Sequence, residues 1–243
     1  DDDNAANRFA ADLRGFSERD VVQLPSRELV MADVVGVSRG YEQRRLAALD
    51  ELTEAHFAVA SVQAAAQRTM SPEALKAAIV SLATGETAPL DELAQSLTRA
   101  GYERCVQVEG TGQFSIRGGI LDVFPPQAEH PYRVEFWDDE IDSISTFDVG
   151  SQRRLEQCEC LRCLPCMESI PALAKGGAAG LAKAVLALTS TRRKKQHADL
   201  QTNLERDAER LRETGSLPAA DKYMPLIYPE MATSFDYLPE NAI

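Results

Sequence analysis

Alternating apolar and polar side chains over residues 113–147 constrain the fold of this 243-residue chain more than any other feature. The segments 113–117, 120–124 and 132–137 alternate with a period of two, the pattern of strands that bury one face. Gly118 and Gly119 separate the first two segments, and an acidic turn, residues 138–140, follows the third. Because short turns join antiparallel strands, the pattern predicts a small antiparallel α+β unit, with Ile144 and Phe147 returning to its core.

Shorter elements before residue 101 indicate an α/β layer. Helices are expected over 3–16, 41–52 and 90–100, with Phe9, Leu13 and Phe16 as the apolar stripe of the first. Another helix begins at Ser71, since Ser followed by Pro is a helix-start signal, and ends at Gly85. Strands are expected over 21–24 and 57–61, and the second is apolar enough to be buried on both faces.

Changes in composition and in the spacing of apolar residues divide the chain into three parts. An α/β part covers residues 1–90, an α+β part covers 91–165, and a helical segment that returns to the first part covers 166–243. The predicted fold class is therefore α/β plus α+β.

Net charge and composition exclude several classes of protein. The formal charge is −12, and residues 101–150 alone hold ten acidic and three basic residues, which argues against a domain that grips nucleic-acid phosphates. No apolar run is long enough to span a membrane. Five cysteines, mostly clustered, favour reduced thiols in the cytoplasm. Together with a start at Asp1 rather than Met, this is typical of an excised piece of a longer intracellular protein.

One face of the predicted strand 132–137 carries unusual residues. Arg133, Glu135 and Trp137 alternate with the core residues, so the chain's single tryptophan is expected on the solvent face. Arg117 points outward in the same way before the glycine pair. Exposed arginine and tryptophan together are typical of protein-binding hot spots. The plainer interpretation is that both arginines pair with nearby carboxylates and Trp137 covers an edge of the core.

These residues carry a resemblance to a known family. Residues 113–126, 132–144, 147–148 and 151–153 resemble the second domain of bacterial transcription-repair coupling factors, which is shared in structure with the excision-repair protein UvrB. Leu24-Pro25, Arg44-Arg45-Leu46 and Tyr237-Leu238-Pro239 resemble the first domain more weakly. The resemblance implies a degenerate RecA-like, UvrB-like α/β domain that lacks a phosphate-binding loop, with an inserted antiparallel UvrA-binding domain.

The resemblance also implies a function. Family members recruit the damage-recognition protein UvrA to stalled RNA polymerase, and Arg117, Arg133 and Trp137 match the family's two arginines and aromatic residue, here a Trp where Phe is common. The other parts of such proteins bind RNA polymerase and move along double-stranded DNA with ATP and Mg²⁺. No Walker motif occurs here, so this piece is expected to bind its partner without catalysis or a cofactor. Replacing Arg133 or Trp137 is expected to weaken binding while barely changing stability.

Other interpretations remain open at this stage. The chain could be the corresponding region of UvrB, although no Tyr-rich hairpin is visible. Cys158, Cys160, Cys163 and Cys166 have a spacing that could ligate zinc or an iron–sulfur cluster or act in redox chemistry, although strand alternation places Cys163 apart from the first two. The basic run 192–195 could touch DNA, and residues 138–140 could bind a cation. Scattered histidines disfavour a hydrolase.

Overall fold

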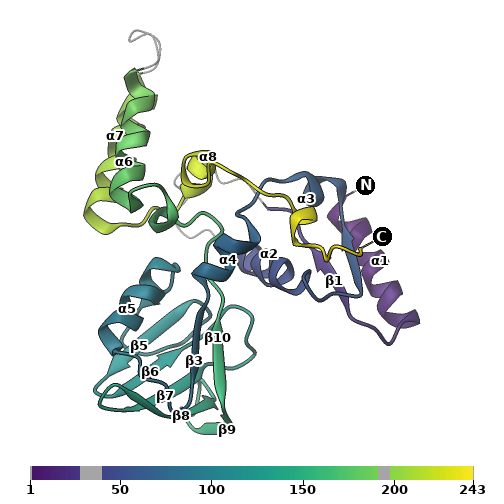
Figure 1. The fold of residues 1–243 in the computed structure, drawn as a ribbon, viewed down its shortest axis with the longest axis vertical. Helices are drawn as coiled ribbons and strands as arrows, with labels where there is room; N and C mark the ends of the chain where they lie inside the picture. Colours follow the sequence, from purple (N-terminus) through teal and green to yellow (C-terminus); the bar gives the residue numbers. More distant parts are fainter. Residues whose placement is uncertain (1, 28–39, 191–197, 243) are drawn as a thin grey trace.

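A computed structural model describes residues 2–27, 40–190 and 198–242. It contains three parts: an α/β layer that includes both ends of the chain, a β-rich unit with a six-stranded sheet, and a helical hairpin that projects from the rest (Figure 1). The basic run 192–195 lies outside the described residues. None of the described helices is both long and apolar enough to cross a bilayer.

The α/β layer is built from short elements in the predicted order. Helix α1 (Asp3–Phe16) precedes β1 (Val21–Leu24), and α2 (Gly40–Glu51) precedes β2 (Phe57–Ala60). The two strands pair in parallel, from Val21 opposite Phe57 to Leu24 opposite Ala60. Helices α3 (Val62–Ala66) and α4 (Pro72–Ala78) follow, and the side chains of Ser61 and Ser71 accept a hydrogen bond from the first turn of each. The expected cap at Ser71 is thus confirmed.

Three expectations for this layer are corrected. Helix α1 buries Ala6 and Ala10, whereas Phe9 and Phe16 are 60% and 92% exposed, because small residues let the helix approach the strands closely. Strand β2 is mostly exposed rather than buried on both faces, since only β1 pairs with it among the described residues. Helix α4 ends at Ala78, well before Gly85, because strand β3 (Val80–Ala83) begins directly after it.

The β-rich unit is an antiparallel sheet with one short parallel edge. Its strands follow the order β4-β5-β6-β7-β8-β9, and only β4 pairs in parallel. Their bounds are β4 (Glu103–Arg104), β5 (Gln113–Arg117), β6 (Ile120–Val123), β7 (Tyr132–Trp137), β8 (Glu140–Phe147) and β9 (Arg154–Cys158). Strand β10 (Cys160–Cys163) pairs instead with β3. The predicted antiparallel unit is therefore confirmed in outline.

One face of this sheet forms the core of the unit. Leu121, Val134 and Ile144 lie in register across β6, β7 and β8, and all three are fully buried. Helix α5 (Leu90–Arg99) covers them with Leu93 and Leu97. Phe147 does not join this core, because a residue three positions after Ile144 falls on the opposite face of a strand. The expectation for Phe147 was wrong in this respect.

The last part of the chain extends outward and then returns. After η1 (Pro171–Leu173), helices α6 (Gly177–Ser190) and α7 (Ala198–Thr214) pack against each other as the projecting hairpin (Figure 1). The segments η2 (Ala220–Tyr223), α8 (Met224–Ile227) and η3 (Ser234–Tyr237) lead back to the α/β layer. There Thr69 and Ala232 form a β-bridge, and the Tyr237 hydroxyl donates to the Met70 carbonyl at 2.9 Å.

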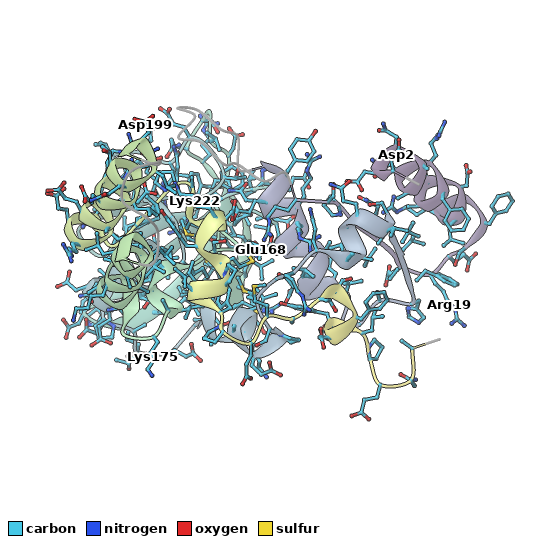
Figure 2. The ribbon with its side chains drawn as sticks, turned by 90° about the horizontal axis from the view of Figure 1, so that it is seen from above. Asp2, Arg19, Glu168, Lys175, Asp199 and Lys222 are labelled. Carbon is cyan, nitrogen blue, oxygen red and sulfur yellow. The ribbon has the colours of Figure 1, made fainter. Side chains whose placement is uncertain are left out.

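A buried ion cluster joins the α/β layer to the end of the β-rich unit. Glu168 lies near the middle of the molecule (Figure 2) and is fully buried, as is Arg45 of α2. One Glu168 carboxylate oxygen lies 3.3 Å from Arg45 Nε and 3.4 Å from Arg27 Nη1. Arg45 also donates to the Pro25 carbonyl at 2.8 Å. Two guanidinium groups therefore share the Glu168 carboxylate away from water, and the Glu42 carboxylate accepts from the Glu168 amide beside them.

Replacing Glu168 with Gln should destabilise the chain by about 3 kcal/mol, because two buried guanidinium groups would lose their counter-ion. Urea unfolding monitored by circular dichroism measures this change. Arg162→Ala is the control: it removes the half-exposed ion pair between Arg162 and Asp50, with N–O distances of 3.1 Å, and should cost less than about 1 kcal/mol. Equal losses in the two variants would contradict the importance of the buried cluster.

Candidate partner-binding surface

The sheet face opposite the core carries polar residues in register. Ser115, Asp122, Arg133 and Ser145 lie side by side on β5, β6, β7 and β8. Ser115, Asp122 and Ser145 are nearly inaccessible to solvent. The Ser115 hydroxyl donates to the Val106 carbonyl at 2.8 Å, so the loop between β4 and β5 covers one end of the row. This face, called the outer face below, is therefore partly shielded and fixed by its neighbours.

Asp122 binds both candidate arginines. Its Oδ1 accepts from Arg133 Nε at 2.7 Å, and its Oδ2 accepts from Arg133 Nη2 and Arg117 Nη2, each at 2.8 Å. The carboxylate is 2% exposed, and its hydrogen bonds are the main reason that the pKa of Arg133 is raised. Arg133 therefore forms the bidentate pair typical of guanidinium and carboxylate groups. Two cations on one anion leave a net positive charge at this point.

The two arginines differ in what they offer a partner. The Arg133 side chain is only 16% exposed: its guanidinium lies 4.5 Å above the Phe147 ring and contacts the Gln152 carbonyl at 3.5 Å. The Arg117 side chain is 51% exposed. The expectation that both guanidinium groups point outward is thus correct for Arg117 and wrong for Arg133, whose donors are used inside the protein. The plainer interpretation held that both arginines pair with nearby carboxylates. They do, and the carboxylate of Asp122 pairs with both of them.

Trp137 is the exposed aromatic residue of this surface. Its side chain is 81% exposed, so it does not cover an edge of the core. Trp137 pairs with Glu140 across the turn between β7 and β8, where Asp138 adopts a φ of +58°. The segment 84–88 holds this turn, because the Ala88 amide donates to the Asp139 carbonyl and the Gly85 amide to the Ile141 carbonyl, both at 2.8 Å. The indole ring of Trp137 is therefore exposed to solvent on a hairpin that is held in place, where a partner could contact it.

A second ion pair lies beside the Asp122 group. Glu135, between Arg133 and Trp137 along the outer face of β7, accepts from the Ser143 hydroxyl at 3.0 Å and forms an ion pair with Arg154 of β9. The Arg154 hydrogen bond is the main cause of the lowered pKa of Glu135. Arg117, Arg133 and Trp137 therefore belong to one face, as expected, and Glu135 and Arg154 extend it.

Sequence reasoning missed Asp122 and Arg154. The contact between Asp122 and Arg117 could have been predicted from the two-residue turn at Gly118 and Gly119. This turn sets Ile120 opposite Arg117, so Asp122, two residues further along β6, is the diagonal neighbour of Arg117 on the same face. No comparable signal existed for Arg154: β8 and β9 pair with a register shift between Ser145 and Phe147, so its contact with Glu135 does not follow from alternation.

The cysteines do not converge on one point. Cys163 and Cys166 are buried near Tyr102, Cys160 is exposed, and Cys158 is half-buried on a different sheet from Cys160. Burial raises the pKa of the Cys163 thiol to about 12, so it is protonated at neutral pH. Within the described residues, no group of three His, Cys, Asp or Glu side chains is placed to hold a metal ion, and this includes the acidic turn 138–140.

Comparison with known proteins identifies the β-rich unit. The family model of the UvrB interaction domain matches residues 80–168, the segment that contains every strand from β3 to β10. The chain is 32% identical to a transcription-repair-coupling factor of Bacillus subtilis, over 98% of this chain and 21% of that protein. It is 31% identical to the factor of Escherichia coli, over 98% of this chain and 20% of that protein.

A UvrB protein is also similar to this chain, at lower identity. The UvrABC system protein B of Kosmotoga olearia is 26% identical over 88% of this chain and 30% of that protein. The chain spans about a fifth of the length of the coupling factors, and it matches them at higher identity than this UvrB protein. Residues 80–168 thus match the UvrB interaction domain, and over nearly its whole length the chain is similar to transcription-repair-coupling factors.

Proposed function

We propose that this region recruits a UvrA-type repair protein through the outer face of its six-stranded sheet. The observation that carries the proposal is the exposed Trp137 on the same face as two arginines held by one buried carboxylate. Aromatic residues and arginines supply most of the binding energy at protein interfaces when they are held in place before binding. The match to the UvrB interaction domain supports a partner of this type.

The three residues would have different roles in the complex. Trp137 would be the anchor, because burial of its exposed ring in an apolar pocket removes the most apolar surface from water. Arg117 would be the direct polar contact, since its half-exposed guanidinium keeps donors beyond the one given to Asp122. Arg133 would be a positioning residue that fixes Asp122, and through it Arg117.

The rest of the proposed function concerns the longer protein. The parallel pair β1 and β2 with its flanking helices supports a degenerate RecA-like layer in the first part of the chain. We propose that this region acts by binding alone, without a cofactor, and that other parts of the protein use ATP and Mg²⁺ to move along double-stranded DNA and to engage RNA polymerase. Because these activities take place on the bacterial chromosome, we propose that the protein acts in the cytoplasm.

Trp137→Ala should weaken binding to UvrA from the same bacterium by at least about 2 kcal/mol, because the anchor would be lost. Its unfolding free energy should not change, since the ring is 81% exposed. Calorimetric titration and urea unfolding measure the two quantities. Phe235→Ala, which removes a 66% exposed ring from the α/β layer, is the matched control and should bind like the parent. Parental affinity in Trp137→Ala would exclude this surface.

Arg133→Ala should reduce both binding and stability, which revises the expectation from sequence that stability barely changes. Asp122 would lose its bidentate partner inside the protein, a loss of about 2 kcal/mol or more in unfolding free energy. Arg117→Ala should weaken binding with a stability loss below about 1 kcal/mol, because Arg117 is half-exposed. Denaturant unfolding of both variants is the measurement. An Arg133→Ala protein as stable as the parent would refute the structural role of Arg133.

A further inference from the structure

Arg154 places a third guanidinium on the outer face. Its backbone lies opposite Phe147 on the sheet edge, yet its side chain forms an ion pair with Glu135 on β7. Since β8 separates β7 from β9, the Arg154 side chain crosses β8 to reach Glu135. It is 51% exposed, as is Arg117, and Glu135 is 30% exposed. Arg154 therefore lies on the surface of the face while its far end is held in place.

The residues between the two half-exposed arginines form a continuous strip. Arg117, Ile120, Glu135 and Ser143 are in register across β5, β6, β7 and β8. Arg117 lies at one end of this strip, and Arg154 reaches its other half at Glu135. Adjacent strands are about 4.8 Å apart, so the backbone positions of Arg117 and Glu135 flank the half-buried Ile120 on its two sides.

The charge on this strip differs from that of the unit around it. The strip and the Asp122 row beside it hold three guanidinium groups, from Arg117, Arg133 and Arg154, against the two carboxylates of Asp122 and Glu135. Glu140 lies on the same face at the end of the sheet, opposite Trp137. Residues 101–150 as a whole are strongly acidic, and Asp138, Asp139 and Glu140 follow directly after Trp137. The strip is thus a cationic island between the acidic turn and the rest of the sheet. Such a charge pattern selects orientation as well as partner.

We infer that Arg154 is a specificity-determining contact, and that the partner presents carboxylate groups beside the apolar pocket that takes Trp137. This inference rests on the proposed function. An acidic segment of the partner would bind Arg117 and Arg154 through charge-assisted hydrogen bonds, with apolar atoms over Ile120. The acidic turn beyond Trp137 would repel the same segment in the reversed orientation, which fixes the direction of docking.

Titration of the chain with UvrA from the same bacterium tests this assignment. Arg154→Ala should weaken binding by about 5-fold and Arg154→Glu by more than about 10-fold, because reversal places a carboxylate against the partner's acidic segment. The affinity of the parent should fall as salt rises, and that dependence should be weaker in Arg154→Glu. The urea midpoint should stay unchanged, since a half-exposed ion pair contributes little to stability.

Arg99→Ala and Arg99→Glu are the matched controls, because Arg99 of α5 has the same charge on the helix that covers the core face of the sheet. Both should bind like the parent. Arg154 variants that match the Arg99 variants, while Trp137→Ala binds weakly, would overturn this inference and leave the proposed function intact. Tighter binding by Arg154→Glu would show a basic partner surface and would also overturn it. No binding by the parent would refute the proposed function and this inference together.

Discussion

The outer face of the sheet depends on one carboxylate shared by two guanidinium groups. Asp122 is 2% exposed, and burying a lone carboxylate would cost several kcal/mol. Arg133 compensates this charge from the next strand and Arg117 from the previous one. Because both arginines bind the Asp122 carboxylate, a change of rotamer in either would remove part of its charge compensation. The residue that orders this surface is therefore itself buried.

Residues near each other in the sequence made much of this arrangement predictable. Alternation gave the correct face to Val134 and Trp137, and the helix-start signal at Ser71 placed the start of α4 correctly. Errors arose where long-range packing decides. Ala6 and Ala10, not Phe9 and Phe16, pack on the strands, and Phe147 supports Arg133 from the outer face. The register of β7 against β6 also depends on the loop 124–131, whose length alone does not determine which residue faces Asp122.

A carboxylate that pairs with two arginines occurs at two places in the structure, with different consequences. At Glu168, one carboxylate serves Arg45 and Arg27, and all three groups are buried. At Asp122, the second arginine remains half-exposed. Only the second place leaves a guanidinium group, that of Arg117, exposed enough to contact another molecule. The first joins the end of the β-rich unit to α2 of the α/β layer.

Rigidity of this kind matters because binding a partner costs the conformational freedom of every side chain that becomes ordered. Arg133 has already lost that freedom in folding, since Asp122, Phe147 and Gln152 hold it. The hairpin that carries Trp137 is tied down by the segment 84–88, so only the indole itself remains to be ordered. The free energy gained by burying that ring is then not reduced by a cost of ordering the hairpin. A strongly acidic unit in this way keeps a small cationic and aromatic surface, the one that we propose for binding a protein partner.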